Sequence, residues 1–268
     1  MKRKRLLCLL ALVLILAMVW VLWANTAIQV NEWTIHCPSL PAAFDGFRIA
    51  QVSDLHNTSH WEAAVKALED AQPDIIVLTG DLIDSRNTDV NAALEFARKA
   101  AAIVPCFYVT GNHESRVPKW RDLRLGLLEA GVQVLENEKC SMEKDGASIH
   151  ILGLMDPDFG GDMADTLSKL TAQSEGFTVL LSHRPERFAL YAECGVDLVF
   201  SGHAHGGQVR IPFLGGLIAP HQGWFPEYDA GLFERDGTRM LVSRGGGNSI
   251  IPLRINNRPE IVIAVLNR

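Results

Sequence analysis

The stretch FRIAQVSDLH, residues 47–56, sets the pattern that decides the fold. It begins with an apolar run rich in strand-favouring residues and ends in a short polar cluster, Ser53-Asp54-Leu55-His56. A helical pattern at 61–71, a strand-like run at 74–78 and a second helical pattern at 91–102 follow it. Strands that alternate with helices in this way predict an α/β fold.

The alternation continues through the rest of the chain, without an internal repeat or a long linker. We expect further strands at 105–109, 149–152, 178–181, 197–200, 240–243 and 261–266, and further helices at 120–130, 164–172 and 185–194. The pattern predicts an α/β sandwich with mixed sheets, formed by one domain at residues 44–268.

The N-terminal segment differs from this domain in composition. Residues 6–24, LLCLLALVLILAMVWVLWA, carry no charge and follow the basic cluster KRKR at 2–5. A helix of these 19 residues measures about 28 Å, close to the roughly 30 Å hydrocarbon core of a bilayer. Trp20 and Trp23 lie near its far end, where aromatic side chains favour the membrane interface.

We therefore interpret residues 6–24 as a transmembrane signal anchor, residues 1–5 as a cytoplasmic basic segment and residues 25–43 as a connector. The alternative is a cleaved signal peptide, whose apolar region is typically about 7–15 residues long. The only candidate cleavage site, Ala24-Asn25-Thr26-Ala27, is weak. Since basic residues stay inside, we expect a single-pass protein of the cell membrane with an extracytoplasmic catalytic domain.

The charge of the domain argues against a nucleic-acid polymer as partner. Four of the 25 cationic residues lie in KRKR, so residues 32–268 hold 21 cations against 31 acidic residues. Proteins that bind a phosphate backbone usually present a basic face. A local cationic site remains compatible with this acidic domain.

Polar clusters follow five of the predicted strands, at the points where these strands end. They are Ser53-Asp54-Leu55-His56, Gly80-Asp81-Leu82-Ile83-Asp84, Gly111-Asn112-His113-Glu114, Ser182-His183 and Gly202-His203-Ala204-His205. Five of the nine histidines lie in these clusters. Ligands of open α/β sheets bind beyond the carboxyl ends of the strands, so we expect one site there.

The residue types in these clusters indicate metal binding. Imidazole nitrogens mixed with carboxylate and amide oxygens favour Mn²⁺, Fe²⁺ or Zn²⁺ over Ca²⁺ and Mg²⁺. The candidate ligands are Asp54, His56, Asp81, Asn112, His183, His203 and His205. Seven ligands are too many for one tetrahedral ion, so we expect two divalent ions, Mn²⁺ before Fe²⁺ or Zn²⁺. Asp81 is the natural bridge, because a carboxylate serves two ions and one imidazole nitrogen does not.

Two such ions would attract a phosphate. Their four positive charges exceed the two negative charges of Asp54 and Asp81, so the site keeps a net charge of about +2. A water bridging the ions would have a strongly lowered pKa and would act as a hydroxide nucleophile. This chemistry predicts a phosphoester hydrolase. Neither a G-x-S-x-G elbow nor a P-loop occurs, which excludes serine-hydrolase and kinase interpretations.

The ordered set D-x-H, G-D-x-x-D, G-N-H-E, H and G-H-x-H, from Asp54 to His205, resembles the calcineurin-like metallophosphoesterase superfamily. The later segments GHAHGGQ at 202–208, SRG at 243–245 and PEI at 259–261 are similar to its bacterial membrane-associated phosphodiesterase branch. The resemblance implies a four-layer αββα sandwich of two mixed sheets flanked by helices. It also implies two sets of metal ligands, Asp54, His56, Asp81 and His205 for one ion and Asp81, Asn112, His183 and His203 for the other.

The same resemblance implies two catalytic residues that bind no metal. His113 would face the substrate, stabilising the transition state or protonating the leaving oxygen, and Asp84 would orient it. Thr110 stands where the protein-phosphatase branch has an arginine, and Ser85-Arg86 replaces its Arg-Gly after the aspartate. Protein phosphatase activity is therefore not expected.

The membrane segment favours a phosphoester at the membrane surface, such as a phospholipid or a lipid-linked diphosphate, as the substrate. Three alternatives stay open: a broad phosphodiesterase of soluble extracytoplasmic esters, a pyrophosphohydrolase of a nucleotide-linked lipid precursor, and a non-catalytic membrane-anchored metal-binding protein. Glu114 is expected to support the metal ligands. The four histidines outside the clusters are expected to be surface or hydrogen-bonded core residues: His36, His60, His150 and His221.

Overall fold

Two six-stranded mixed sheets form the middle of the protein in a computed structural model that describes residues 2–248 and 253–268. The first sheet has the order β1 (Gln29–His36), β16 (Glu260–Asn267), β2 (Arg48–Val52), β3 (Ile75–Thr79), β4 (Cys106–Val109) and β5 (Gln133–Val134). The second has the order β14 (Gly231–Arg235), β15 (Thr238–Val242), β9 (Leu198–Ser201), β8 (Thr178–Leu181), β7 (Ala147–Gly153) and β6 (Glu138–Lys144).

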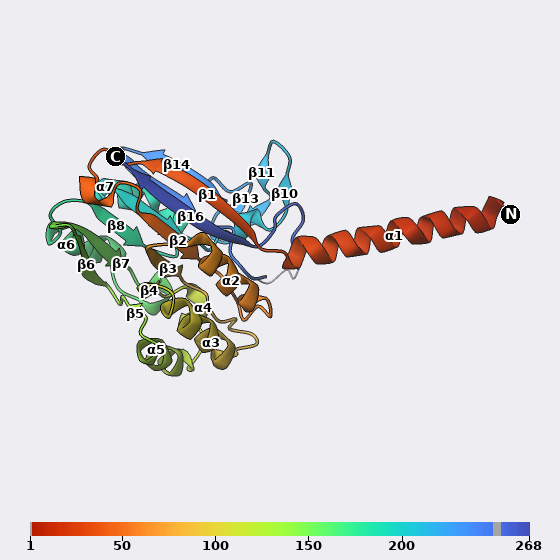
Figure 1. The fold of residues 1–268 in the computed structure, drawn as a ribbon, viewed down its shortest axis with the longest axis horizontal. Coiled ribbons are helices and arrows are strands. Elements are labelled where there is room, and N and C mark those ends of the chain that lie inside the picture. Colours follow the sequence, from red (N-terminus) through yellow and green to blue (C-terminus); the bar gives the residue numbers. More distant parts are fainter. Residues whose placement is uncertain (1, 249–252) are drawn as a thin grey trace.

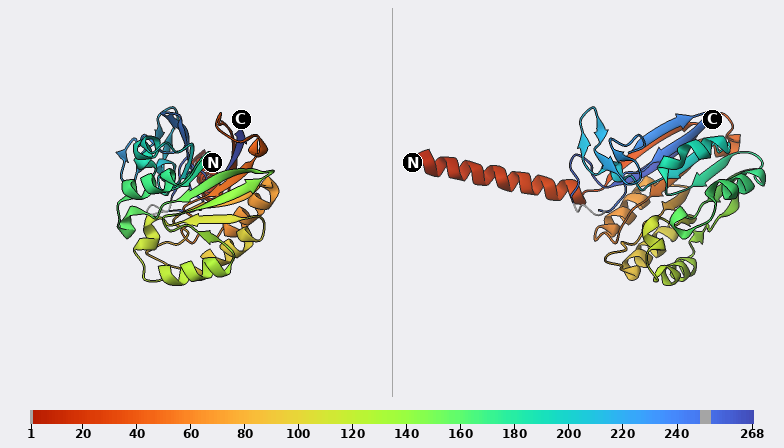
Figure 2. Two further views of the ribbon diagram at one scale, coloured as in Figure 1. Left: turned by 90° about the vertical axis from the view of Figure 1, so that its left-hand side faces the viewer. Right: turned by 180° about the vertical axis from the view of Figure 1, so that it is seen from behind.

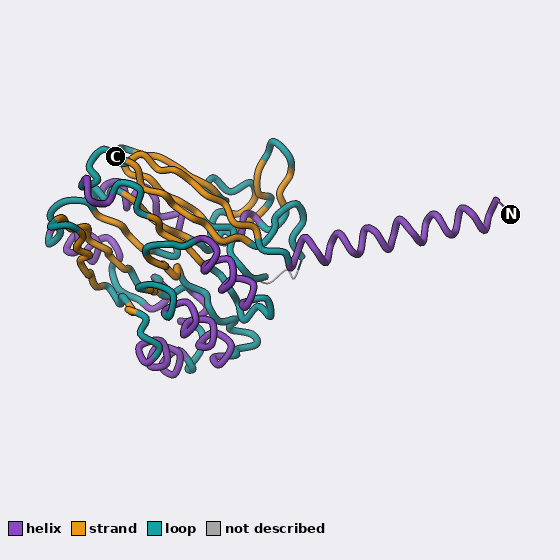
Figure 3. Tube along the Cα trace, in the orientation of Figure 1, coloured by secondary structure: helices purple, strands orange, loops and turns teal. Residues whose placement is uncertain are grey.

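Helices cover the outer face of each sheet, which gives the expected four-layer αββα sandwich. Helices α2 (Trp61–Ala71), α3 (Val90–Ala101) and α5 (Trp120–Glu129) pack on the first sheet. Helices α6 (Met163–Ala172) and α7 (Phe188–Glu193) pack on the second. Figure 3 shows the strands in the middle of the globular body, with α2, α3 and α5 along one side.

The core follows from strands that are apolar on both faces. In β3, Ile75 and Val77 point into the core between the two sheets, and Ile76 and Leu78 point into the core under the helices. Strands buried on both faces read as continuous apolar runs, which is why the sequence predicted them. Their buried side chains fix both sheets, and with them the loops that follow each strand.

The expected connector at 25–43 is wrong in one respect, because its residues 29–36 form strand β1. This strand pairs in parallel with β16 over its whole length. Only Ile35 of its eight residues is buried, since β1 is the edge strand of its sheet. Strand β6, which the sequence did not predict, is likewise an edge strand with exposed polar residues. Edge strands bury little, so they carry no apolar pattern to recognise.

Helix α1 (Lys2–Thr26) projects away from the globular body (Figures 1 and 2). The part at Arg3–Thr26 is long and apolar enough to cross a membrane, and none of its most apolar window is buried. Two small hairpins lie at the end of the body from which α1 leaves: β10 (Arg210–Ile211) with β11 (Gly215–Gly216), and β12 (Ile218–Ala219) with β13 (Gly223–Trp224).

Candidate metal centre

The predicted ligands lie in loops that follow parallel strands of both sheets. Asp54 and His56 follow β2, Asp81 follows β3, and Asn112 begins the short helix α4 (Asn112–Ser115) after β4. His183 follows β8, and His203 and His205 follow β9. Backbone hydrogen bonds join neighbouring loops, for example from Asp54 N to Gly80 O (3.0 Å). The carboxyl ends of the two sheets therefore meet at one site.

Five of these seven residues have a left-handed backbone. The φ angles are 52° at Asp54, 46° at His56, 53° at Asp81, 66° at His203 and 48° at His205. Such a conformation is uncommon for residues other than glycine and costs on the order of 1–3 kcal/mol at each position. Strain of this kind persists where the surrounding structure imposes it, and it clusters at functional sites.

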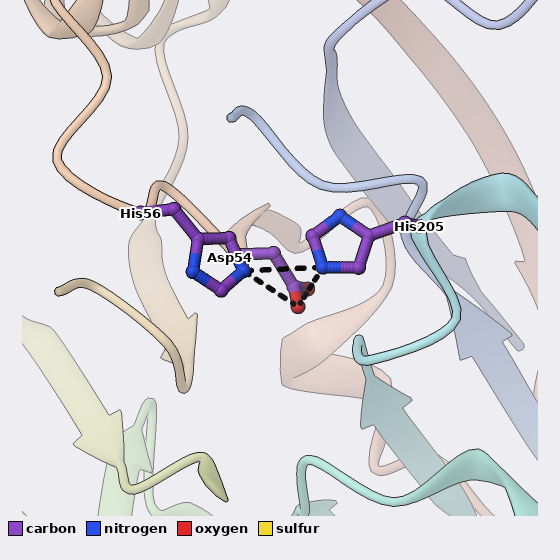
Figure 4. Close-up of side chains that lie close together, drawn as sticks. All are labelled: Asp54, His56 and His205. Carbon is purple, nitrogen blue, oxygen red and sulfur yellow. Dashed lines mark hydrogen bonds and ion pairs between the residues drawn. The ribbon is translucent and has the colours of Figure 1, made fainter. Parts of the chain in front are cut away.

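The first group of side chains is Asp54, His56 and His205 (Figure 4), all buried. Nε2 of His56 lies 3.1 Å from Nε2 of His205. Oδ1 of Asp54 lies 3.3 Å from Nε2 of His205 and 3.8 Å from Nε2 of His56. Ligand atoms about 2.1 Å from one ion lie roughly 3.0–3.4 Å from one another; two of the three spacings fall in this range and the third is slightly longer, so the group could converge on a common cation.

The second group is Asp81, His183 and His203, also buried. Nε2 of His183 lies 3.2 Å from Oδ2 of Asp81 and 3.1 Å from Nδ1 of His203. Nε2 of His56 lies 3.7 Å from the same carboxylate oxygen of Asp81. Asp81 thus lies between the two groups, where its carboxylate could serve both.

The orientation of Asn112 fits a cation in the second group. Its side-chain oxygen lies 2.8 Å from Nδ1 of His203 and 3.3 Å from Nε2 of His183. Its amide nitrogen faces the guanidinium of Arg116. Hydrogen bonding alone favours the opposite orientation, in which the amide donates to both rings. The position of the Asn112 amide group, 2.8 Å and 3.3 Å from two imidazole nitrogens, suits a third ligand of one ion, so the residues fit the metal that they were expected to hold.

Surrounding hydrogen bonds hold the ligands in place. Thr79 O accepts a hydrogen bond from Nδ1 of His183 (2.7 Å), which leaves the Nε2 lone pair aimed into the site. The backbone N–H of His203 donates to the Asp54 carboxylate (3.0 Å), and that of His113 donates to Oδ1 of Asp81 (2.8 Å). A Cβ at position 111 would collide with the Asp81 carboxylate, so only glycine fits there.

Glu114 supports the site as expected. Its fully buried carboxylate accepts hydrogen bonds from the backbone N–H of Gly111 (2.8 Å), Asp81 (3.0 Å) and Ile83 (3.3 Å). It therefore joins the loop after β3 to the loop after β4. Burial and the nearby Asp81 carboxylate raise the pKa of Glu114 to about 8, although these backbone donors oppose the shift.

The ionisable ligands are strongly perturbed by burial and by one another. Burial lowers the pKa of His183, but the Asp81 and Asp54 carboxylates outweigh it and raise this pKa to about 10. Burial raises the pKa of Asp54 to about 6 and lowers that of His56 to about 4. Burial would raise the pKa of Asp81, but the charge on His183 holds it well below its usual value. Such perturbations cluster at functional sites.

His113 borders the metal ligands. Its ring centroid lies 4.4 Å from that of His56, with Asp81 close by. The predicted orienting residue Asp84 makes no hydrogen bond to it, because its carboxylate oxygen lies 3.9 Å from Nδ1 of His113. The Ser85 N–H donates to Nδ1 instead (3.0 Å), and the Asp84 carboxylate binds Arg86 (2.8 Å). The Nε2 atom of His113 therefore carries the proton of the neutral ring.

Two further residues at the site were not predicted. Arg184 is buried and forms ion pairs with Asp156 (2.5 Å) and Asp158 (3.0 Å). His221, expected to be a surface or hydrogen-bonded core histidine, is exposed, and its ring stacks on that of His203. Its Nδ1 lies 2.9 Å from Nε2 of His203 and 2.8 Å from Nη1 of Arg184. A lone arginine and a lone histidine form no motif, so the sequence carried no signal for either.

Comparison with known proteins gives a consistent result. The family model described as calcineurin-like phosphoesterase matches residues 47–207. The uncharacterized metallophosphoesterase YkuE of Bacillus subtilis is 32% identical, covering 89% of this chain and 85% of its own length. The phosphodiesterase YaeI of Escherichia coli is 28% identical, covering 82% of each chain.

A relative from Danio rerio is described as a transmembrane protein with metallophosphoesterase domain. It is 28% identical to this chain; the match covers 90% of this chain and 57% of the relative. Among solved structures, the sulfate thiohydrolase SoxB of Thermus thermophilus superposes with a TM-score of 0.52 at 13% identity, over 85% of this chain and 57% of SoxB. This last similarity concerns the fold alone.

Proposed function

This chain belongs to the calcineurin-like phosphoesterase family and is a metal-dependent phosphoester hydrolase; from this premise we propose that it is a membrane-anchored phosphodiesterase with two metal ions. Asp54, His56, Asp81 and His205 would hold one ion, and Asp81, Asn112, His183 and His203 the other. The observation that carries the proposal is the convergence of two buried groups of ligand atoms on either side of Asp81.

Manganese is our first choice of metal, with iron or zinc as alternatives, because the ligand set mixes imidazole with carboxylate and amide oxygen. When bound, two such ions polarise the phosphoryl oxygens and lower the pKa of a water that serves as nucleophile. His113 supplies an Nε2–H donor to the substrate from outside the two ligand sets. Glu114 keeps the loops that carry Asp81 and His113 at a fixed separation.

The proposed substrate is a phosphoester presented at a membrane surface. Helix α1 supports this proposal because it is apolar, unburied and long enough to span a bilayer. The basic residues before it favour a cytoplasmic N-terminus and an extracytoplasmic catalytic domain. A relative named as a transmembrane protein is consistent with an anchor.

The experiment is a paired measurement on the full-length protein in detergent or nanodiscs. Metal content per chain is measured after loading with Mn²⁺, Fe²⁺ or Zn²⁺, and each form is assayed on bis-p-nitrophenyl phosphate and on lipid extracts. We expect two ions per chain and diester hydrolysis. Bound metal without turnover of any ester would favour the non-catalytic protein, and selective cleavage of nucleotide-linked lipids would favour the pyrophosphohydrolase.

Topology is tested separately. Protease added to spheroplasts should degrade the catalytic domain, and the full-length chain should stay with membranes during high-salt and alkaline carbonate washes. Protection of the domain until the membrane is permeabilised would reverse the proposed orientation. A soluble form that begins near Asn25 would show that the apolar segment is a signal peptide.

A further inference from the structure

Exposed apolar side chains gather in two segments at the α1 end of the body, residues 209–225 and 253–258, which we call the platform. Among the described residues outside α1, these segments hold most of the exposed large hydrophobic side chains. They are Phe213 (106% exposed), Leu214 (66%), Trp224 (67%), Phe225 (58%), Leu253 (38%) and Ile255 (40%). Phe213 and Leu214 form the tip of the β10–β11 hairpin, which projects from the body beside α1 in Figures 1 and 2.

Backbone hydrogen bonds join the chain segments that carry these side chains. Arg210 N donates to Ile255 O (3.0 Å), Leu217 N to Val209 O (2.8 Å), and Phe225 N to Leu217 O (2.9 Å). The two hairpins and the 253–258 segment therefore lie side by side. Six exposed apolar side chains on adjoining segments concentrate apolar surface in one region, whereas single exposed hydrophobic residues need no explanation.

The platform is fixed to the end of α1. Asn25 accepts a hydrogen bond from Arg254 N (2.6 Å), and its amide donates to Arg254 O (3.1 Å). Arg258 donates to Ala27 O and Ile28 O (both 3.0 Å), and its guanidinium lies over the Trp23 ring, 4.4 Å from the centroid. A bilayer spanned by α1 would therefore begin next to the platform.

The composition of the platform suits a membrane surface. Its two segments contain no Asp or Glu; of their three arginines, Arg210 pairs with Asp229 (3.0 Å), Arg254 is buried and Arg258 is partly exposed. The rest of the domain is strongly acidic, so this is the face that anionic headgroups would repel least. Tryptophan and phenylalanine are side chains that favour the interface between headgroups and acyl chains.

The platform also borders the metal site. The Arg254 guanidinium lies 3.4 Å from Nδ1 of His205, and its backbone binds Asn25 at the end of α1. The β12–β13 hairpin carries Trp224 and also His221, which contacts His203. One short layer of residues therefore separates the bilayer end of α1 from two of the metal ligands.

We propose that the platform inserts its apolar side chains into the interface of the bilayer that α1 spans, and so presents the metal site to phosphoesters in lipid headgroups. This inference rests on the proposed function, since it requires α1 in the membrane. It adds a second contact that orients the domain. The substrate class that follows is a diester whose phosphate lies at headgroup depth.

Tryptophan quenching tests the insertion directly. The full-length protein is placed in vesicles of anionic and zwitterionic phospholipid, some of them brominated near the headgroup end of the acyl chains. The emission lost on bromination is compared between the wild type, Trp224→Phe and a variant with Trp20→Phe and Trp23→Phe. We expect brominated lipid to quench both Trp224 and the α1 tryptophans, so each variant should lose part of the quenching seen in the wild type.

The two possible failures are distinguishable. Quenching of Trp20 and Trp23 without quenching of Trp224 would overturn the platform proposal and leave the anchor intact. Absence of quenching at Trp20 and Trp23 would show that α1 does not enter the membrane, which would overturn the anchoring as well. Shielding of Trp224 only when another protein is present would overturn the lipid proposal in favour of a protein partner.

Kinetics supply the second test. Phe213→Ser combined with Leu214→Ser is assayed in vesicles on a headgroup phosphodiester and on soluble bis-p-nitrophenyl phosphate. We expect the rate on the lipid ester to fall about tenfold while that on the soluble ester is unchanged, because only interfacial contact is lost. The matched control is Leu125→Ser with Leu128→Ser, which removes two exposed leucines of α5 (56% and 44% exposed) without touching the platform. An equal loss in the control, or no loss in the platform variant, would overturn the proposal.

Discussion

Polar side chains are usually exposed and apolar side chains usually buried, but the metal-site loops bury polar groups and the platform exposes apolar ones. In the site loops the carboxylate of Asp54 and the imidazole of His183 have no exposed surface. In the platform Phe213 is fully exposed and Trp224 is two-thirds exposed. Removing ionisable groups from water is costly unless partners compensate them, and an exposed apolar patch is unfavourable in water. Each region therefore indicates a partner that the protein itself does not supply: metal cations at the site loops and a lipid bilayer at the platform.

The two regions also differ in how the fold holds them. The site loops follow parallel strands in the middle of both sheets and are joined by hydrogen bonds to Glu114 and to each other. The platform depends on strands of two residues and on its contacts with the end of α1. The first region is positioned by the core, whereas the second is positioned by the anchor.

The largest effect should follow from Asp81→Asn. Asp81 lies between both groups of ligands, so an amide there removes the bridging charge of the site. Turnover should fall to background, and bound metal should fall below two ions per chain by elemental analysis. Asp145→Asn is the matched control, because Asp145 also has a positive φ (50°) but is exposed in a turn. Full activity and two bound ions in Asp81→Asn would contradict the role of Asp81 as a metal ligand.

The metal-site side of this contrast could be predicted from the sequence, and the reason is physical, whereas the platform was not predicted. Buried strands are apolar throughout, and the chemistry of metal ligation restricts which residues can follow them. Both signals are local, so the sandwich and the seven convergent residues were predictable. Edge strand β1 and the role of His221 depend on contacts with distant segments, namely β16 and His203. Patterns along one chain contain no record of such contacts.

The next largest effect should be that of His113→Ala. This ring borders the site without belonging to either predicted ligand set, so both metals should remain while the rate falls about 10²- to 10⁴-fold. Asp84→Asn should cost less, because Ser85 N–H and not Asp84 binds Nδ1 of His113. Loss of metal in His113→Ala would show that His113 is a ligand. A larger loss in Asp84→Asn than in His113→Ala would contradict the orientation seen here.

His221→Ala should give a smaller effect, and it tests whether the two regions are coupled. His221 belongs to the platform, yet its Nδ1 lies 2.9 Å from Nε2 of the predicted ligand His203. Groups that hold the free nitrogen of a ligating histidine typically contribute about 10- to 100-fold in metal affinity or activity. Chelator competition should show this loss for one of the two ions. His150→Ala is the control, since His150 binds Ser141 and Glu175 O away from the site. Equal affinities in both variants would separate the platform from the metal site.

The smallest expected effect is the change in metal affinity with each unit of pH. Metals bind neutral imidazole, but the carboxylates beside His183 raise its pKa to about 10, so the metal-free protein carries a proton there at pH 7. Burial lowers the pKa of His56 to about 4 and holds those of His203 and His205 well below the usual value, so these rings are already neutral. Binding should therefore release one proton from His183, and a second when a metal-bound water ionises, so affinity should rise at least tenfold per pH unit between roughly pH 6 and 9. Below about pH 6, protonation of Asp54 should steepen this dependence.

Calorimetry in two buffers of different ionisation enthalpy measures the released protons. Release of no proton at pH 7 would mean that His183 is neutral in the metal-free protein, and release of more than two would mean that the other site histidines are charged. A second measurement, the retention of the full-length protein on vesicles as a function of pH, compares the platform with the metal site. Anchoring depends on burial of the apolar helix α1, which contains no acidic residue or histidine, so retention on vesicles should stay constant while metal affinity changes. Parallel pH dependences of the two would indicate that the bound metals, and not the anchor, position the platform on the membrane.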